Sequence, residues 1–152
     1  MTSIALAIAT VFGVGRVPVA PGTFGSAAGL LLWAALSGSI AAQGAVISMV
    51  FVAGSWSGGV TERHYGATDP GAVVIDEVLG MLITLFFNPV SWTGALVGFL
   101  LFRVFDVIKP YPANRLERLH GGLGIMSDDA MAAVYANMVL RALIAVVPAG
   151  WL

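Results

Sequence analysis

The longest stretch without a charged side chain lies between Arg16 and Glu62 and comprises 45 residues. At 1.5 Å per residue, a helix of that length exceeds twice the ~30 Å thickness of a bilayer's hydrocarbon core. Small and polar residues interrupt the stretch near its middle, from Ser37–Ser39 through Gln43–Gly44. The stretch therefore predicts a helical hairpin, with arms at about Phe24–Leu36 and Ala45–Val60.

The composition of the 152-residue chain agrees with a membrane protein. Hydrophobic residues make up 59% of it and charged residues only 10%, whereas about a quarter of the residues of a soluble domain are charged. The mean hydropathy is +0.94. The alternative is a soluble helical protein with a large apolar core, and a homo-oligomer is compatible with either interpretation. The length predicts one domain over residues 1–152, the lack of cysteine excludes thiolate metal sites, and no basic patch indicates nucleic-acid binding.

A second uncharged run, Val78–Phe102, is broken at Asn88–Pro89, where the proline cannot continue a helix. This run predicts another hairpin, whose arms extend into the neighbouring charged segments. A final helix is expected to begin at Ser127, a good N-cap residue followed by two acids that suit a first turn. The sequence thus predicts an all-α fold, a small integral-membrane bundle of about five to six helices built from two helical hairpins and a C-terminal helix. The expected ranges are Ala72–Phe87, Trp92–Ile108 and Ser127–Val147, with a short interfacial or buried helix within Met1–Gly15.

The charged parts of the chain are predicted to lie on one side of the membrane. They are Arg16, Glu62–Glu77 and Arg103–Asp129, and they hold six of the seven Lys and Arg residues. Both hairpin turns lie on the other side and are uncharged. Because Lys and Arg are enriched on the cytoplasmic side of membrane proteins, we expect a multi-pass protein of the inner (cytoplasmic) membrane whose functional site faces the cytoplasm.

The acidic residues are few and clustered. Five of the eight lie in three short segments, at Asp76–Glu77, Asp106 and Asp128–Asp129. An unpaired charge in apolar surroundings costs several kcal/mol, so acids there pair with basic groups or bind metal. Structural ion pairs are one interpretation. The other is a divalent-metal site, because the acids outnumber the basic residues of the same segments, and oxygen ligands without cysteine favour Mg²⁺, with Mn²⁺ as the alternative.

Two basic residues, Arg103 and Lys109, flank Asp106 at three residues on either side. On a helix these positions share a face, so the two cations would form a clamp for a phosphate whose charge a metal also neutralises. The alternative is a helix end at the membrane interface, where long basic side chains reach toward the headgroups.

Two glycine-containing segments precede predicted helices, Pro21–Ser26 and His120–Met126. Free amides at a helix N-terminus bind phosphate, which makes Thr23 a candidate phosphate contact. Glycines in membrane helices more often permit close packing. His120 is a candidate proton acceptor or donor, because histidine titrates near neutrality; the alternative is a loop histidine at the interface.

Together these segments resemble the bacterial phosphatidylglycerophosphatase A family, integral-membrane Mg²⁺-dependent phosphatases of phospholipid synthesis. The resemblance implies removal of the phosphate monoester from phosphatidylglycerol phosphate, which leaves phosphatidylglycerol. It also implies metal ligation by the family's acidic positions and places three further polar residues in its motifs. The motifs are APGTFGS (Ala20–Ser26), VVIDEVLGM (Val73–Met81), FRVFDVIKPYP (Phe102–Pro112) and HGGLGIMSDD (His120–Asp129). The residues at the family's acidic positions are Asp76, Glu77, Asp106, Asp128 and Asp129. The three further polar residues are Arg103, Lys109 and His120.

A metal-assisted hydrolysis is expected on this basis. Adjacent residues of a helix point about 100° apart, so Asp76 and Glu77 are expected to serve different partners, with Asp76 as the direct metal ligand. Asp128 or Asp129, with His120 nearby, would act as base or proton donor. An aspartyl-phosphate intermediate is the mechanistic alternative.

Two other functions are compatible with the same residues. One is a small divalent-cation transport protein, because acids within the membrane also mark ion pathways. The pairing of Arg103 and Lys109 with Asp106 argues against it, since a cation pathway has reason to avoid positive charge. The other is a phosphatase that acts on a different lipid phosphate.

Overall fold

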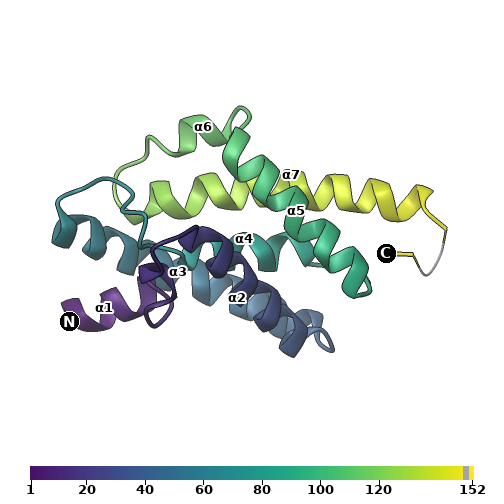
Figure 1. The fold of residues 1–152 in the computed structure, drawn as a ribbon, viewed down its shortest axis with the longest axis horizontal. Coiled ribbons are helices and arrows are strands. Elements are labelled where there is room, and N and C mark those ends of the chain that lie inside the picture. The colour runs from purple at the N-terminus through teal and green to yellow at the C-terminus, as the bar shows by residue number, and fades with distance from the viewer. Residues whose placement is uncertain (149–150) are drawn as a thin grey trace.

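The computed structural model describes residues 1–148 and 151–152, and all regular structure in these residues is helical (Figure 1). The predicted all-α class is confirmed. The predicted count of five to six helices is wrong, since seven α-helices and one 3-10 helix are described. The unforeseen α-helix is α6, whose four residues are too few to show a helical pattern of hydrophobicity. In chain order the elements are α1 (Thr2–Ala9), η1 (Val14–Arg16), α2 (Pro21–Leu36), α3 (Ile40–Tyr65), α4 (Ile75–Leu85), α5 (Trp92–Ile108), α6 (Ala113–Leu116) and α7 (Gly122–Val146).

Helices α2 and α3 form the predicted first hairpin, and its turn at Ser37–Ser39 is shorter than the expected break, which extended to Gly44. Ser39 caps α3, because its hydroxyl accepts a hydrogen bond from the Ala42 N–H at 3.2 Å. The helix therefore begins at Ile40, five residues earlier than predicted. It ends at Tyr65, and the next residue, Gly66, has a φ of 66°, in the left-handed region that glycine adopts without strain.

The second hairpin consists of α4 and α5, and its two arms differ in how well the sequence predicts them. Helix α5 has the predicted bounds, Trp92–Ile108. Helix α4 has 11 residues and not the predicted range Ala72–Phe87. A helix of that size is roughly 16 Å long, about half of the ~30 Å hydrocarbon core, so α4 does not cross a membrane alone.

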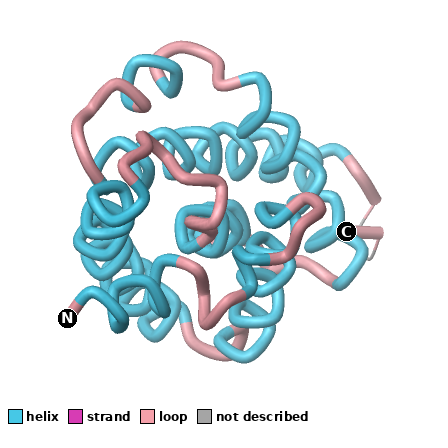
Figure 2. The backbone as a smooth tube through the Cα atoms, turned by 60° about the vertical axis from the view of Figure 1, so that its left-hand side comes forward, coloured by secondary structure: helices cyan, strands magenta, loops and turns pink. Residues whose placement is uncertain are grey.

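Helix α4 forms the centre of the bundle. It packs against α2, α3, α5 and α7, and Figure 2 shows one helix almost end-on with the others around it. Nine of its 11 residues are buried, among them Leu79, Met81 and Leu82. Asp76 and Glu77 lie in the first turn of α4, so the central position of this helix places both acids inside the bundle.

Helix α7 begins at Gly122, so the predicted start at Ser127 is wrong. The reason is tertiary packing. A Cβ atom at Gly122 would lie 2.0 Å from the Ser55 carbonyl oxygen and 2.7 Å from the Gly59 nitrogen, so only glycine lets α7 approach α3 this closely. The earlier start moves Asp128 and Asp129 out of the first turn and into the body of the helix.

A Gly122→Ala substitution should therefore destabilise the bundle. The added methyl group would meet backbone atoms that cannot turn aside, and such overpacking typically costs about 1–3 kcal/mol. The expected result is a lower midpoint of thermal unfolding in detergent. Gly38→Ala is the matched control, because a Cβ at Gly38 has no heavy atom within 4 Å. Equal midpoints for the two variants would contradict the close α3–α7 contact.

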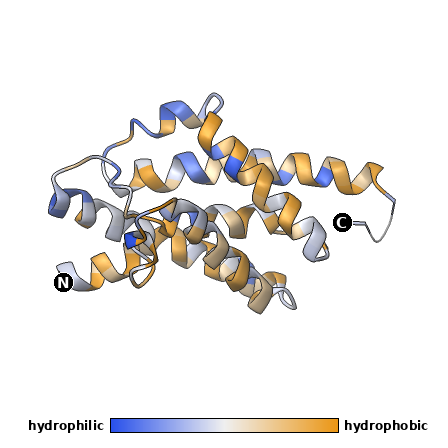
Figure 3. Ribbon diagram, viewed as in Figure 1, coloured by the Kyte–Doolittle hydropathy of each residue, from blue (hydrophilic) through white to orange (hydrophobic). Residues whose placement is uncertain are grey.

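Two helices, α3 and α7, are long and apolar enough to cross a membrane by length and composition. Hydrophilic residues gather on α6 and near the C-terminal end of α3, while much of the remaining ribbon is coloured as hydrophobic (Figure 3). The two hairpin turns meet at the opposite end, where Ser37 and Ile40 line the same cavity as Phe87 and Asn88. This arrangement agrees with the predicted sorting of charge to one end and supports association with a membrane.

Candidate active site

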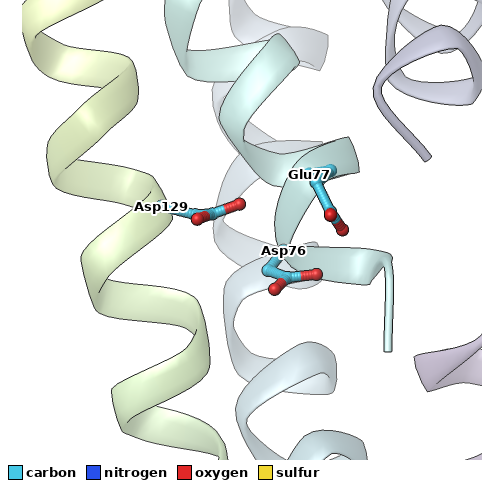
Figure 4. Close-up of side chains that lie close together, drawn as sticks. All are labelled: Asp76, Glu77 and Asp129. Carbon is cyan, nitrogen blue, oxygen red and sulfur yellow. The ribbon is translucent and has the colours of Figure 1, made fainter. Parts of the chain in front are cut away.

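Three carboxylates from two helices converge inside the bundle. Asp76 and Glu77 come from the first turn of α4. Asp129 comes from α7, and its side chain points toward α4 (Figure 4). One oxygen of each lies within 4.8 Å of the others. Asp76 is 7% exposed and Asp129 is 3% exposed. This group is called the acidic cluster below.

The start of α4 is held in place by the N-terminal segment. The Val74 N–H donates a hydrogen bond to the Ala9 carbonyl oxygen at 2.9 Å, which joins the end of α1 to the residue before α4. The two acids then occupy the first turn, where free N–H groups and the helix dipole stabilise negative charge. The dipole offsets part of the cost of burying two carboxylates, but it does not supply a partner for each oxygen.

The acidic cluster contains polar atoms that lack partners. Asp76 Oδ1, Glu77 Oε2 and Asp129 Oδ2 are all buried without a hydrogen bond. Among the described residues no basic side chain forms an ion pair with Asp76 or Asp129. Buried carboxylates without partners are costly unless a cation or protons neutralise them.

The donor set of the acidic cluster fits a divalent cation. Mg²⁺ binds carboxylate oxygens at about 2.1 Å, so two of its ligands lie at most about 4.2 Å apart. The oxygens of the acidic cluster lie within 4.8 Å of one another, so small side-chain rotations would suffice. The three unpartnered oxygens are the atoms that such an ion would need.

Arg103 borders the acidic cluster. Its Nη1 atom lies 2.7 Å from Asp106 Oδ2 and 3.7 Å from Glu77 Oε1. The predicted pairing of Arg103 with Asp106 on one helical face is therefore present. Asp106 in turn lies beside Asp129, so it connects the guanidinium to the cluster without being one of its three members.

Lys109 and Asp128 form a separate pair. The Lys109 ammonium donates a short hydrogen bond to Asp128 Oδ2, and Glu117 Oε1 lies 3.8 Å from the same nitrogen. Burial alone would lower the pKa of Lys109, but the hydrogen bond and charge of Asp128 outweigh it and raise that pKa, so the side chain stays protonated. Lys109 thus contacts Asp128 and not Asp106, the partner that helical spacing predicted.

The segment Pro21–Ser26, which was predicted to precede a helix, instead forms the first turns of α2, and it lies against the acidic cluster. A Cβ atom at Gly22 would stand 2.2 Å from Glu77 Oε1 and 3.1 Å from Arg103 Nη1. The close packing inferred from the sequence is therefore present, and its partner is the site itself. Thr23, the predicted phosphate contact, is exposed in the same turn, and its N–H donates to the Ala20 carbonyl oxygen at 2.9 Å.

His120 lies in the loop before α7 and is exposed. In the described part of the chain no hydrogen bond or ion pair connects it to the acidic cluster. The next residues pack on α3, since a Cβ at Gly121 would lie 3.8 Å from Glu62 Oε2. Sequence reasoning also missed Glu117 as a partner of Lys109, because the prolines between them leave no helical spacing to indicate it.

Comparison with known proteins assigns the family. The family model for phosphatidylglycerophosphatase A matches residues 7–144. Phosphatidylglycerophosphatase A of Haemophilus influenzae is 39% identical over 140 residues, which cover 90% of this chain and 86% of the relative. The protein of the same name in Escherichia coli is 35% identical over 136 residues, 88% of this chain and 79% of the relative. A Bacteroides thetaiotaomicron relative, provisionally named a phosphatidylinositol-3-phosphatase, is 34% identical over 142 residues, 88% of this chain and 89% of its own. No solved structure matches the chain. The chain therefore belongs to the phosphatidylglycerophosphatase A family.

Proposed function

We propose that the protein hydrolyses the phosphate monoester of phosphatidylglycerol phosphate and releases phosphatidylglycerol and inorganic phosphate. Membership of a phosphatase family supports the reaction class. The observation that carries the proposal is the acidic cluster, whose buried oxygens lack partners beside an arginine. A divalent cation held by these acids, next to a guanidinium, would suit a substrate that is itself a phosphate.

Asp76, Glu77 and Asp129 would hold Mg²⁺, and Mn²⁺ is compatible with the same oxygens. The ion would supply Lewis-acid polarisation and positive charge at the phosphate. Asp106 and Asp128 are predicted ligands that the structure places beside basic partners. Their proposed part is to hold those partners, Arg103 and Lys109, in position.

Arg103 is the proposed phosphate contact. Its side chain is 25% exposed while Asp106 fixes one nitrogen, so the remaining N–H groups can reach an arriving phosphate. A planar guanidinium donates two parallel hydrogen bonds to phosphate oxygens, and this geometry stabilises the charge of the transition state. Lys109 already neutralises two acidic neighbours, Glu117 and Asp128, and is therefore the second candidate for the phosphate contact.

Asp129 is the proposed proton acceptor. Its Oδ2 atom has no partner, whereas Asp128 is engaged by Lys109. Water that attacks phosphorus loses a proton as the new P–O bond forms, and the carboxylate oxygen of Asp129 that does not bind the ion would take it. The leaving glycerol oxygen requires a proton in return, and His120 would deliver it only if the loop before α7 moved inward.

The proposed location is the cytoplasmic leaflet of the inner membrane. The acidic cluster lies toward the charged end of the bundle, near Arg103 and Lys109. That end also carries most of the basic residues, which favour the cytoplasmic side. A phosphate headgroup in this leaflet would meet the site without leaving the membrane surface.

The test is phosphate release from phosphatidylglycerol phosphate in mixed micelles with purified protein. Activity should fall to background in EDTA and return with excess Mg²⁺, and Mn²⁺ should restore part of it. Phosphatidylinositol 3-phosphate serves as the second substrate because one relative carries that name. Activity unaffected by EDTA would contradict the proposed metal site, and a clear preference for the inositol lipid would contradict the proposed headgroup.

A further inference from the structure

The outer face of α5 is apolar over its whole length. Large hydrophobic side chains recur along it at helical spacing and are at least half exposed. Near its C-terminal end a hollow of about 360 Å³ is lined by four of them together with Arg103. The exposed residues are Trp92 (57%), Leu96 (54%), Leu100 (63%), Val104 (51%), Val107 (76%) and Ile108 (66%).

One side chain, Arg103, lies between the hollow and the acidic cluster. Among the described residues that line it, Arg103 is the one charged residue: its apolar stem borders the hollow, and its guanidinium lies 3.7 Å from Glu77 Oε1 and 2.7 Å from Asp106 Oδ2. A molecule whose apolar part lies in the hollow would therefore have the Arg103 guanidinium within one side-chain length, where an anionic part could meet it. A phospholipid with a phosphate headgroup has this combination of parts.

The dimensions also suit one lipid chain. From Arg103 back to Trp92 the helix is roughly 16 Å long at 1.5 Å per residue. One leaflet contributes about half of the ~30 Å hydrocarbon core. The exposed stripe thus extends from the level of Arg103 about as far as an acyl chain extends into its leaflet.

We propose that this face of α5, from Leu96 to Ile108, binds an acyl chain of the lipid substrate and sets the distance of its phosphate from Arg103. The inference rests on the proposed lipid phosphatase function and adds a specificity surface outside the acidic cluster. Burying an acyl chain against apolar side chains stabilises the ground-state complex and the transition state by the same amount. Such uniform binding changes KM and leaves kcat nearly unchanged.

A tryptophan at position 104 tests the proposal kinetically. Val104→Trp fills the hollow without touching the acidic cluster, so KM for long-chain phosphatidylglycerol phosphate should rise about tenfold while kcat stays within about twofold. A dihexanoyl analogue, whose chains are too short to reach along α5, should show little change in KM. The matched control is Val52→Trp on α3, where the wild-type valine is 69% exposed. Equal KM values for the Val104 and Val52 variants would overturn the proposal.

A second measurement does not depend on turnover. Phosphatidylglycerol phosphate with a diazirine in its acyl chain should cross-link mainly to residues 96–108, whereas diazirine phosphatidylcholine should label α3 and α5 alike. An Arg103→Met variant should lose the difference between the two probes. Equal labelling of α3 and α5 by the anionic probe would overturn the proposal. Localised labelling by a protein that releases no phosphate would instead uphold this surface and contradict the proposed reaction.

Discussion

An Asp76→Asn variant is expected to release phosphate from phosphatidylglycerol phosphate at least about a thousandfold more slowly than the wild type. Such a loss corresponds to roughly 4 kcal/mol of transition-state stabilisation. The substitution keeps the shape of the side chain but removes one of three clustered negative charges. A neutral amide is a poorer ligand for a hard divalent cation than a carboxylate, so the proposed ion would bind more weakly and out of position.

Thermal unfolding of the same variant separates a metal site from a structural role. In EDTA, Asp76→Asn should be at least as stable as the wild type, because it relieves repulsion among buried carboxylates that lack partners. In excess Mg²⁺ the order should reverse, since a ligand that binds only the folded state stabilises it. The wild-type midpoint should thus rise with Mg²⁺ and the variant's should not.

The comparison variant is Asp69→Asn, the same chemical change in the loop between α3 and α4, at an acid that lies within electrostatic reach of Lys109 but outside the acidic cluster. It should keep activity close to that of the wild type and retain the response of the unfolding midpoint to Mg²⁺. If Asp76→Asn kept activity within about tenfold of the wild type, the acidic cluster would not be the catalytic centre. A variant that unfolds in both EDTA and Mg²⁺ would show instead that Asp76 is needed for folding.

The fold was predictable where one local signal decides it. Long uncharged runs and the turn residues that interrupt them predicted both hairpins and the bounds of α5. The bounds of α4 and α7 depend on tertiary contacts. Helix α4 begins only after Val74, whose N–H bonds to the Ala9 carbonyl oxygen of α1, and α7 begins at Gly122, where α3 packs so closely that only glycine fits. Neither of these tertiary contacts can be inferred from a single sequence.

The candidate site was predictable as a set of acids but not as a geometry. Clustering along the chain identified all three members of the acidic cluster. Helical spacing alone could not decide which of two adjacent acids faces which partner. Asp76 and Glu77 were expected to serve different partners; both reach the cluster, and Glu77 also approaches Arg103. Of the other adjacent pair, only Asp129 joins it, because Lys109 lies beside Asp128.

A Lys109→Met variant is expected to be destabilised by about 3 kcal/mol, and a second substitution, Asp128→Asn, should recover most of the loss. Asp128 is only 3% exposed at its side chain, so removing Lys109 leaves a buried carboxylate without its basic partner. Breaking a buried pair from one side costs about 3–5 kcal/mol, and the low end applies because Lys109 is 23% exposed. Once Asp128 is neutral, the methionine has no unpaired charge beside it.

The double-mutant cycle decides between two interpretations of Asp128. If Asp128 serves mainly to hold Lys109, the coupling free energy between the two substitutions should reach about 1–3 kcal/mol, measured as unfolding in detergent with EDTA present. Asp128→Asn alone should then be mild, because Glu117 still lies 3.8 Å from Lys109 Nζ. If Asp128 is instead a metal ligand, as the family motif implies, the coupling should be small in EDTA, and Asp128→Asn should abolish the stabilisation by Mg²⁺ as Asp76→Asn does. A strong coupling together with an intact Mg²⁺ response would leave Asp76, Glu77 and Asp129 as the ligands and give Asp128 the task of positioning a cation at the edge of the site.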